Sequence, residues 1–132
     1  MRIFTDTNVL VSAFMTRGLC ADLFEIIVAE HELLIGEPVM TELKRILGKK
    51  FRAPAALVER VEAELRLHTV VPRTRKPLEL PIRDKEDPLI VACALAAKAD
   101  IFVTGDQELL GLQTVQDMPI ISPRTCWQQL HD

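Results

Sequence analysis

Four acidic residues, each beside the end of a predicted strand or in the early part of a predicted helix, are the side chains best suited to chemistry: Asp6, Glu42, Asp87 and Asp106. Asp6 directly follows the apolar run IFT, and Asp106 follows IFVT after Gly105, which permits a sharp backbone turn. Asp87 opens an apolar helix, and Glu42 borders the apolar stripe of another. Because ligands gather outside the carboxyl ends of parallel strands, we expect these acids to meet at one edge of a sheet.

Carboxylates that meet in this way must be neutralised. Two unit charges about 4 Å apart repel each other by roughly 4 kcal/mol at an effective dielectric constant near 20. A fold either raises the pKa values of such groups or places a cation among them. Ligands that are all carboxylate oxygens favour Mg²⁺ or Mn²⁺, which can activate a water and neutralise a departing phosphate oxygen. The acids therefore predict a metal site that cleaves a phosphodiester.

Each acid also has a purely structural interpretation. Asp6 and Asp106 suit turns or helix caps, and Glu42 would by default be a solvated helical side chain. Asp87, which precedes a proline, would by default cap its helix. Asp84 is a nearby competitor that could assist from outside the ligand set. The joint pattern, rather than any single acid, supports the site.

Other chemistries find little support in the composition. The three cysteines and three histidines lie far apart, without the spacing of a zinc site or of a Ser-His or Cys-His nucleophile system. The net charge of −3 does not indicate nucleic-acid binding, although a local basic strip could still hold phosphates. The apolar runs are too short to span a bilayer, and residues 1–14 lack the pattern of a secretory signal. We therefore expect a cytoplasmic protein without membrane segments.

Short apolar strands alternate with amphipathic helices along the whole chain. This alternation predicts one α/β domain over residues 1–132, a three-layer α/β/α sandwich around a central, mainly parallel five-stranded sheet. The predicted strands cover residues 1–5, 32–36, 69–71, 101–104 and 119–122. The predicted helices cover residues 7–15, 20–30, 37–50, 54–67, 88–99, 107–111 and 123–130, and residues 72–87 read as an irregular loop.

The chain resembles the PIN-domain nucleases, in particular the VapC-like toxin components of bacterial and archaeal toxin–antitoxin systems. The resemblance covers nearly the whole chain and rests on four segments: IFTDTNVLVSAF, EPVMTELKRIL, RDKEDPLIVACALAAKADIFVTGDQELL and PIISPRTCWQQL. It implies a three-layer fold and an endoribonuclease that depends on Mg²⁺ or Mn²⁺ and leaves 5′-phosphate and 3′-hydroxyl ends.

The resemblance also assigns roles to residues. Asp6, Glu42, Asp87 and Asp106 match the acidic quartet of the family. Asn8 matches its polar helper, and Thr104 matches the small hydroxyl residue that precedes the last acid. Asp84 competes with Asp87 for the third place, and we prefer Asp87 because it directly opens the apolar helix.

Two basic clusters could hold the RNA backbone beside the acids, or could simply be a solvated helix end and loop. The first contains Lys44, Arg45, Lys49, Lys50 and Arg52, and the second contains Arg73, Arg75 and Lys76. Aromatic residues are 5% of the chain, so base stacking is expected to be minor. The resemblance further implies a homodimer and a cognate antitoxin that blocks the site.

Other functions stay open at this point. A phosphatase using Asp6 as nucleophile would need a second acid two residues later, where this chain has Asn8. A non-catalytic RNA-binding or partner-binding module of the same fold would gain nothing from the carboxylates. A housekeeping RNA-processing nuclease would share the chemistry without the toxin role.

Overall fold

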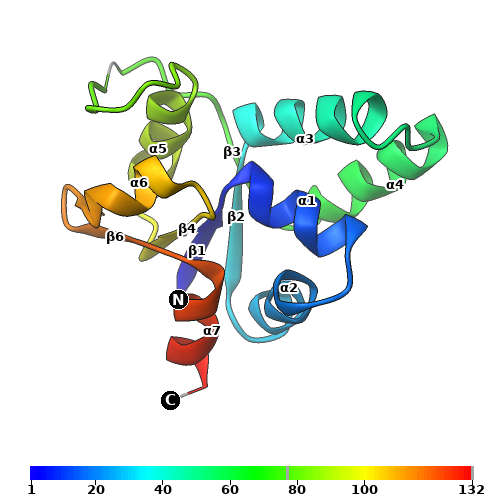
Figure 1. The fold of residues 1–132 in the computed structure, drawn as a ribbon, viewed down its shortest axis with the longest axis horizontal. Coiled ribbons are helices and arrows are strands. Elements are labelled where there is room, and N and C mark those ends of the chain that lie inside the picture. Colours follow the sequence, from blue (N-terminus) through cyan, green and yellow to red (C-terminus); the bar gives the residue numbers. More distant parts are fainter. Residues whose placement is uncertain (77, 132) are drawn as a thin grey trace.

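Six strands form one sheet in the computed structural model of the chain, which describes residues 1–76 and 78–131 (Figure 1). Across the sheet they are β3 (Thr69–Val71), β2 (Glu32–Gly36), β1 (Arg2–Thr5), β4 (Ile101–Val103), β6 (Met118–Ile121) and β5 (Thr114–Val115). Neighbouring strands run parallel, except that β5 pairs antiparallel with β6. The mainly parallel sheet is therefore confirmed, with β5 as a sixth, two-residue strand that the sequence did not predict.

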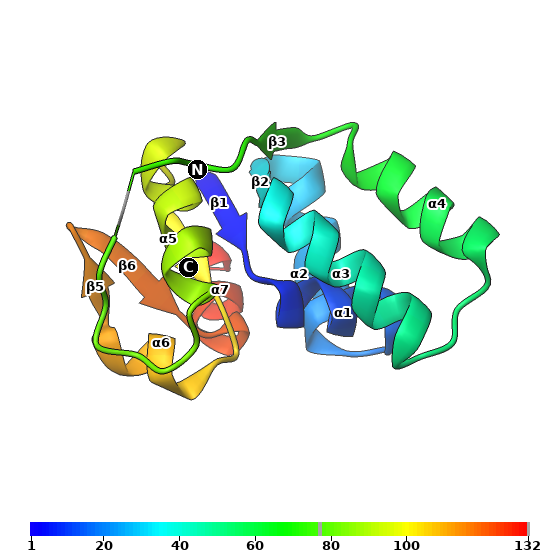
Figure 2. The same cartoon turned by 90° about the horizontal axis from the view of Figure 1, so that it is seen from above.

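Helices cover both faces of this sheet. They are α1 (Thr7–Met15), α2 (Leu19–Glu30), α3 (Glu37–Lys49), α4 (Ala55–Leu65), α5 (Asp87–Ala96), α6 (Gln107–Leu112) and α7 (Pro123–Leu130). Helices α1 to α4 lie on one side of the strands and α5 and α6 on the other, as Figures 1 and 2 both show. Helix α7 packs against α2, and α3 also contacts α5. The three-layer α/β/α arrangement is confirmed.

The central strands are aligned so that their carboxyl ends stand level. Thr5 pairs with Val103, and one residue earlier the fully buried rings of Phe4 and Phe102 stack with centroids 5.3 Å apart. A Cβ atom at Gly36 would lie 3.1 Å from the Phe4 ring, so glycine lets the end of β2 pack closely on it. This register brings the residues that follow β1 and β4 to the same edge.

Burial of α5 agrees with its apolar sequence. Ile90, Val91 and Cys93 are at most 2% exposed, and burial raises the pKa of the Cys93 thiol. Burial also raises the pKa of Cys126 to about 11, and all three cysteines are free. The thiols of Cys93 and Cys126 therefore stay protonated near neutral pH. Among the residues described, no helix is long and apolar enough to cross a membrane.

Candidate active site

Asp6 and Asp106 lie at the ends of adjacent parallel strands, β1 and β4. Strand β1 lies between β2 and β4 in the sheet. After β1 the chain adds β2 and β3 on one side and later adds β4 on the other, so the boundary between β1 and β4 is the switch point of the sheet. Both acids also cap helices. Asp6 accepts a hydrogen bond from the Thr7 N–H (2.8 Å), and Asp106 Oδ1 accepts from Glu108 N–H (2.8 Å) and Leu109 N–H (3.1 Å).

The hydroxyl of Thr104 joins these two strand ends. Thr104 is fully buried, and its Oγ1 donates to Asp6 Oδ2 at 2.7 Å. The same oxygen accepts from the Asp106 N–H at 3.0 Å and from Asn8 Nδ2 at 3.3 Å. Asp6 is therefore oriented by a group on the neighbouring strand, and the backbone of Asp106 is held to the same point.

Asn8 completes this network from the first turn of α1. Its Nδ2 also donates to Asp6 Oδ2 at 3.2 Å, and its Oδ1 accepts from the Gly105 N–H at 2.8 Å. Glycine was expected at position 105 because it permits a sharp turn, but Gly105 does not adopt a positive φ, so this explanation is wrong. Glycine is instead required by the close approach of the Asn8 side chain, because a Cβ atom at position 105 would lie 3.2 Å from Asn8 Oδ1.

Asp87 does not cap its helix in the way expected. Helix α5 begins at Asp87, and the preceding Glu86 occupies the N-cap position without a capping side-chain hydrogen bond. Within residues 1–76 and 78–131, the N–H groups of Leu89 and Ile90 donate to the Glu86 carbonyl and not to the Asp87 side chain. The side chain of Asp87 is nevertheless only 8% exposed. Helix capping therefore does not account for this buried carboxyl group.

The electrostatic surroundings of Asp87 bring the predicted acids together. Burial is the largest cause that raises the pKa of Asp87 to about 7. The remaining causes are neighbouring negative charges, in decreasing order those of Asp6, Asp84, Asp106 and Glu42. Burial likewise raises the pKa of Asp6, against the lowering effect of its hydrogen bonds, with smaller contributions from Glu42 and Asp106. Acidic side chains from four segments of the chain thus lie close enough to raise the pKa of one another.

Glu42 and Asp84 lie at the margin of this cluster. Glu42 is half-buried on α3, whereas Asp84 is exposed and its Oδ1 accepts from the Glu86 N–H at 2.8 Å. The Asp84 carboxylate is thus occupied in a local turn before α5. Asp87 is the more buried of the two competitors for the third position.

The donor set fits a hydrated hard cation. In the described parts of the chain, no group of three His, Cys, Asp or Glu side chains is arranged to hold a metal ion. Mg²⁺ retains several waters and takes one or two carboxylates directly, so it does not require a closed protein cage. Burial is the largest cause that raises the pKa values of Asp6 and Asp87, and neighbouring negative charges raise them further; a bound cation would offset both effects.

Capping and metal binding by Asp106 can be separated by two substitutions. Asp106→Asn keeps an oxygen for the two N–H groups of α6, so we expect it to melt no lower than wild type in EDTA. Asp106→Ala loses the cap and about 1 kcal/mol of stability. Thermal unfolding with and without Mg²⁺ measures both, and we expect each variant to lose stabilisation by Mg²⁺. An Asn variant as unstable as the Ala variant would assign Asp106 a structural role alone.

Two basic side chains from the separate clusters share a pocket with Glu42. Arg45 on α3 and Arg73 after β3 line a cavity of about 290 Å³ together with Glu42 and Glu86. Neither arginine has an ion-pair partner in residues 1–76 and 78–131. No pattern in the sequence indicated that these two arginines line one pocket, because they belong to segments far apart in the chain.

The other predicted basic residues differ in their surroundings. Lys44 Nζ binds Glu62 Oε1 on α4 at 2.8 Å, and hydrogen bonds from Lys44 and then Arg66 lower the pKa of Glu62. Lys44 therefore joins α3 to α4. Lys49 and Arg75 are exposed and line none of the described pockets around the acids.

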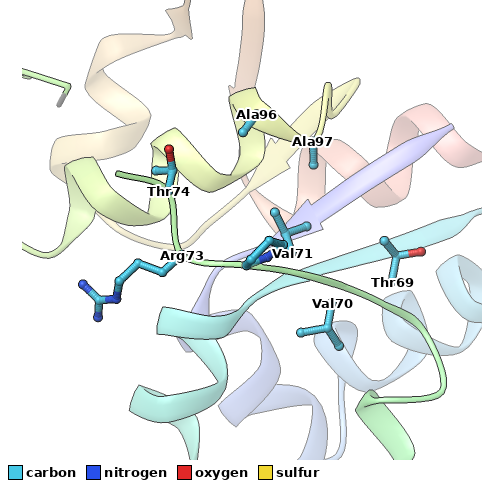
Figure 3. A pocket seen from close by; sticks show the side chains of 8 residues that line it. Thr69, Val70, Val71, Arg73, Thr74, Ala96 and Ala97 are labelled. Carbon is cyan, nitrogen blue, oxygen red and sulfur yellow. The ribbon is translucent and has the colours of Figure 1, made fainter. Parts of the chain in front are cut away.

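A second cavity near Arg73 contains none of the four acids. It has a volume of about 430 Å³ and lies between β3 and the C-terminal part of α5 (Figure 3). Val71 and Ala97 line it, and the Arg73 side chain extends away from Ala97 in this view. This cavity is mostly apolar and lies outside the acidic cluster.

A mainly parallel α/β sheet with carboxylates at its switch point places this chain among the α/β proteins whose ligands bind at that edge of the sheet. The model of the PIN domain family matches residues 2–108, and the chain belongs to this family. PIN domains are generally nucleases.

Two solved structures share the fold. VapBC2 from Rickettsia felis, bound to a DNA fragment from its promoter, matches with a TM-score of 0.62 and 16% identity, over 92% of this chain and 98% of that chain. The PIN domain endonuclease Utp24 matches with a TM-score of 0.56 and 22% identity, over 92% of this chain and 84% of that chain. No curated protein sequence matches this chain.

Proposed function

We propose that the chain is a metal-dependent endoribonuclease, formed by residues 1–132 as one PIN nuclease domain. The observation that carries the proposal is Asp87, a buried carboxyl group that caps nothing and whose pKa is raised to about 7 by burial and by four surrounding acids. Such an arrangement is costly for stability, and a bound cation is the simplest compensation. Family membership supports nuclease chemistry.

The acids have distinct proposed roles. Asp6 and Asp106 hold the ion from the ends of β1 and β4, while Asp87 and Glu42 complete the site directly or through water. The bound Mg²⁺ or Mn²⁺ supplies positive charge and an acidic water for hydrolysis of the phosphodiester. Thr104 and Asn8 fix the orientation of Asp6 through the hydrogen bonds described above, so they are positioning residues.

The substrate class is tested by incubating the chain with single-stranded RNA, and separately with single-stranded DNA, in Mg²⁺, Mn²⁺ or EDTA. We expect internal cleavage of RNA with either metal and none in EDTA. Undiminished cleavage in EDTA would contradict metal dependence. Binding of RNA without cleavage under all three conditions would favour a non-catalytic binding module.

Arg45 and Arg73 are proposed to hold a phosphate of the RNA beside Glu42. We expect each Arg→Ala substitution to weaken RNA binding and to lower the slope of log affinity against log salt by about 0.7, the value for one contact to single-stranded nucleic acid. Fluorescence anisotropy across a salt series measures the slope. Arg60→Ala, an exposed arginine on α4, is the matched control and should leave the slope unchanged. An unchanged slope in the Arg45→Ala and Arg73→Ala variants would remove these residues from the RNA path.

The biological role proposed is that of a cytoplasmic toxin, active as a homodimer and inhibited by a cognate antitoxin. Similarity of fold to VapBC2 supports this role. The PIN domain endonuclease Utp24 shares the fold as well, and an RNA-processing nuclease is the alternative. A small gene that overlaps the coding region upstream would support the toxin. Expression in a bacterial host provides the functional test, since a toxin arrests growth and an RNA-processing enzyme does not. Gel filtration with light scattering measures the oligomeric state.

A further inference from the structure

A groove between α1 and α3 is lined in part by Asn8, the residue that donates a hydrogen bond to Asp6. The two helices pack against each other, as Figure 2 also shows. The groove has a volume of about 330 Å³ and shares no lining residue with the arginine pocket, to which Glu42 belongs. Its lining is mainly apolar and includes Asn8, Val11, Ser12, Ile46, Lys50 and Phe51.

Phe51 contributes an exposed aromatic ring to the lining of this groove. It is 41% exposed and is the only aromatic among the exposed large hydrophobic side chains of the described residues. Two backbone hydrogen bonds fix the chain around it: Phe51 N–H donates to Ile46 O (3.3 Å) and Ala53 N–H donates to Leu47 O (2.9 Å). Between them Arg52 adopts φ 52°, a left-handed conformation unfavourable for a side chain of this kind. The backbone that carries the Phe51 ring is therefore fixed, and the ring lies outside the buried core.

Positive charge accompanies this ring. Lys50 lines the same groove and has no ion-pair partner in the segments that the structure describes. Lys49 and Arg52 flank it at the C-terminal end of α3 and are exposed as well. An aromatic face beside free cations is the combination that binds single-stranded nucleic acid, since every base can stack and every phosphate carries charge.

We propose that this groove binds one nucleotide of the RNA strand next to the bond that is cut, with its base stacked on Phe51 and its phosphate beside Lys50. This inference rests on the proposed function and extends it by assigning a base-binding position. The volume lies within the range of about 300–1,000 Å³ that is typical of small-ligand sites. The continuity of the groove with Asn8, together with its positive rim, favours a nucleotide over a protein side chain. The strand would then pass the acids beside Asn8 and reach Phe51.

The test measures binding of a short single-stranded oligoribonucleotide that carries one 2-aminopurine, whose fluorescence is quenched by stacking. All variants are made in the full-length chain with Asp6→Asn, which prevents cleavage, and are measured in Mg²⁺. We expect Phe51→Ala and Phe51→Leu to weaken binding about 10-fold and to abolish the additional quenching, and Phe51→Trp to retain both. Leu67→Ala is the matched control, because Leu67 is 82% exposed and lies away from the groove.

An abasic oligonucleotide separates stacking from charge. With this probe the Phe51 variants should bind as tightly as the Asp6→Asn parent, whereas Lys50→Ala should still bind more weakly and Lys50→Arg should not. The proposal is overturned if Phe51→Ala weakens the binding of both oligonucleotides equally, or weakens the binding of neither. A dimer that becomes a monomer in Phe51→Ala with unchanged RNA affinity also overturns it and assigns the groove to a second copy of the chain.

The same experiments distinguish this inference from the proposed function. If the wild-type chain cleaves RNA and Phe51→Ala has no effect on the two probes, only the base-binding position fails. If the wild-type chain neither binds nor cleaves RNA in Mg²⁺ or Mn²⁺, the nuclease function fails and the groove proposal fails with it.

Discussion

Replacing Asp6 by asparagine is expected to reduce RNA cleavage by more than roughly 100-fold while leaving the fold intact. The substitution removes the negative charge at the centre of the network but keeps an oxygen for the Thr7 N–H. The amide nitrogen that replaces Oδ2 cannot accept the hydrogen bonds from Thr104 and Asn8, so both are lost. Removal of a buried charge, and of its repulsion with Glu42 and Asp106, offsets part of that loss. We therefore expect the free energy of unfolding in EDTA to fall by no more than about 2 kcal/mol.

The measurement is the initial rate of cleavage of a labelled RNA, with circular dichroism to confirm the fold. Asp117→Asn is the matched control, because Asp117 is an exposed acid in the turn between β5 and β6 whose positive φ suits asparagine equally well. The control should cleave at the wild-type rate. A folded Asp6→Asn variant that retains wild-type activity would remove the acids from the chemistry.

Replacing Asp87 by asparagine is expected to increase stability in the absence of metal while strongly reducing cleavage. The folded pKa of about 7 lies above the ordinary value of 3.8, so between these values the folded chain retains a proton that the unfolded chain has lost. The free energy of unfolding of the wild type therefore falls as the pH rises from about 4 to about 7 and stays low above that. Asparagine has no such proton, so the variant lacks this decline.

The gain should be largest near pH 8 and should disappear below about pH 4. The shift corresponds to at most about 4 kcal/mol, and because the neighbouring acids are partly exposed to solvent we expect roughly 1–2 kcal/mol. Urea unfolding in EDTA across this pH range measures the difference, with Asp84→Asn as the control on an exposed neighbour. With Mg²⁺ the difference in the free energy of unfolding between the variant and the wild type should narrow or change sign, since the ion stabilises the wild type more. An Asp87→Asn variant less stable than wild type at pH 8 would show that the carboxylate supports the fold.

The fold was predictable because each element carries a strong local pattern. The apolar runs IFT and IFVT correspond to β1 and β4, and the uniformly apolar segment after Pro88 forms the buried helix α5. Strand β5 escaped prediction because two residues carry no periodicity and the pairing of Val115 with Met118 depends on the turn between them. The order of strands, which makes β1 and β4 neighbours, is a tertiary property that a single sequence does not encode visibly.

The positions of two candidate acids were more predictable than their surroundings. Position after a strand indicated Asp6 and Asp106, and both lie at the switch point. The sequence assigned Asp87 a capping role by default, because burial and the charges of distant segments become visible only in three dimensions. The engagement of Lys44 by Glu62 and the exposure of Phe51 likewise depend on how α3 and α4 pack and end.

The central claim is that the four acids form one site for a divalent cation, and titration with Mn²⁺ tests it most directly. Electron paramagnetic resonance of free Mn²⁺ gives the affinity of the wild-type chain and of four variants: Asp6→Asn, Glu42→Gln, Asp87→Asn and Asp106→Asn. We expect saturable binding by wild type and at least about 10-fold weaker binding by each variant, with Asp117→Asn unchanged. Wild-type affinity in all four variants, or no saturable binding by the wild type, would contradict the account.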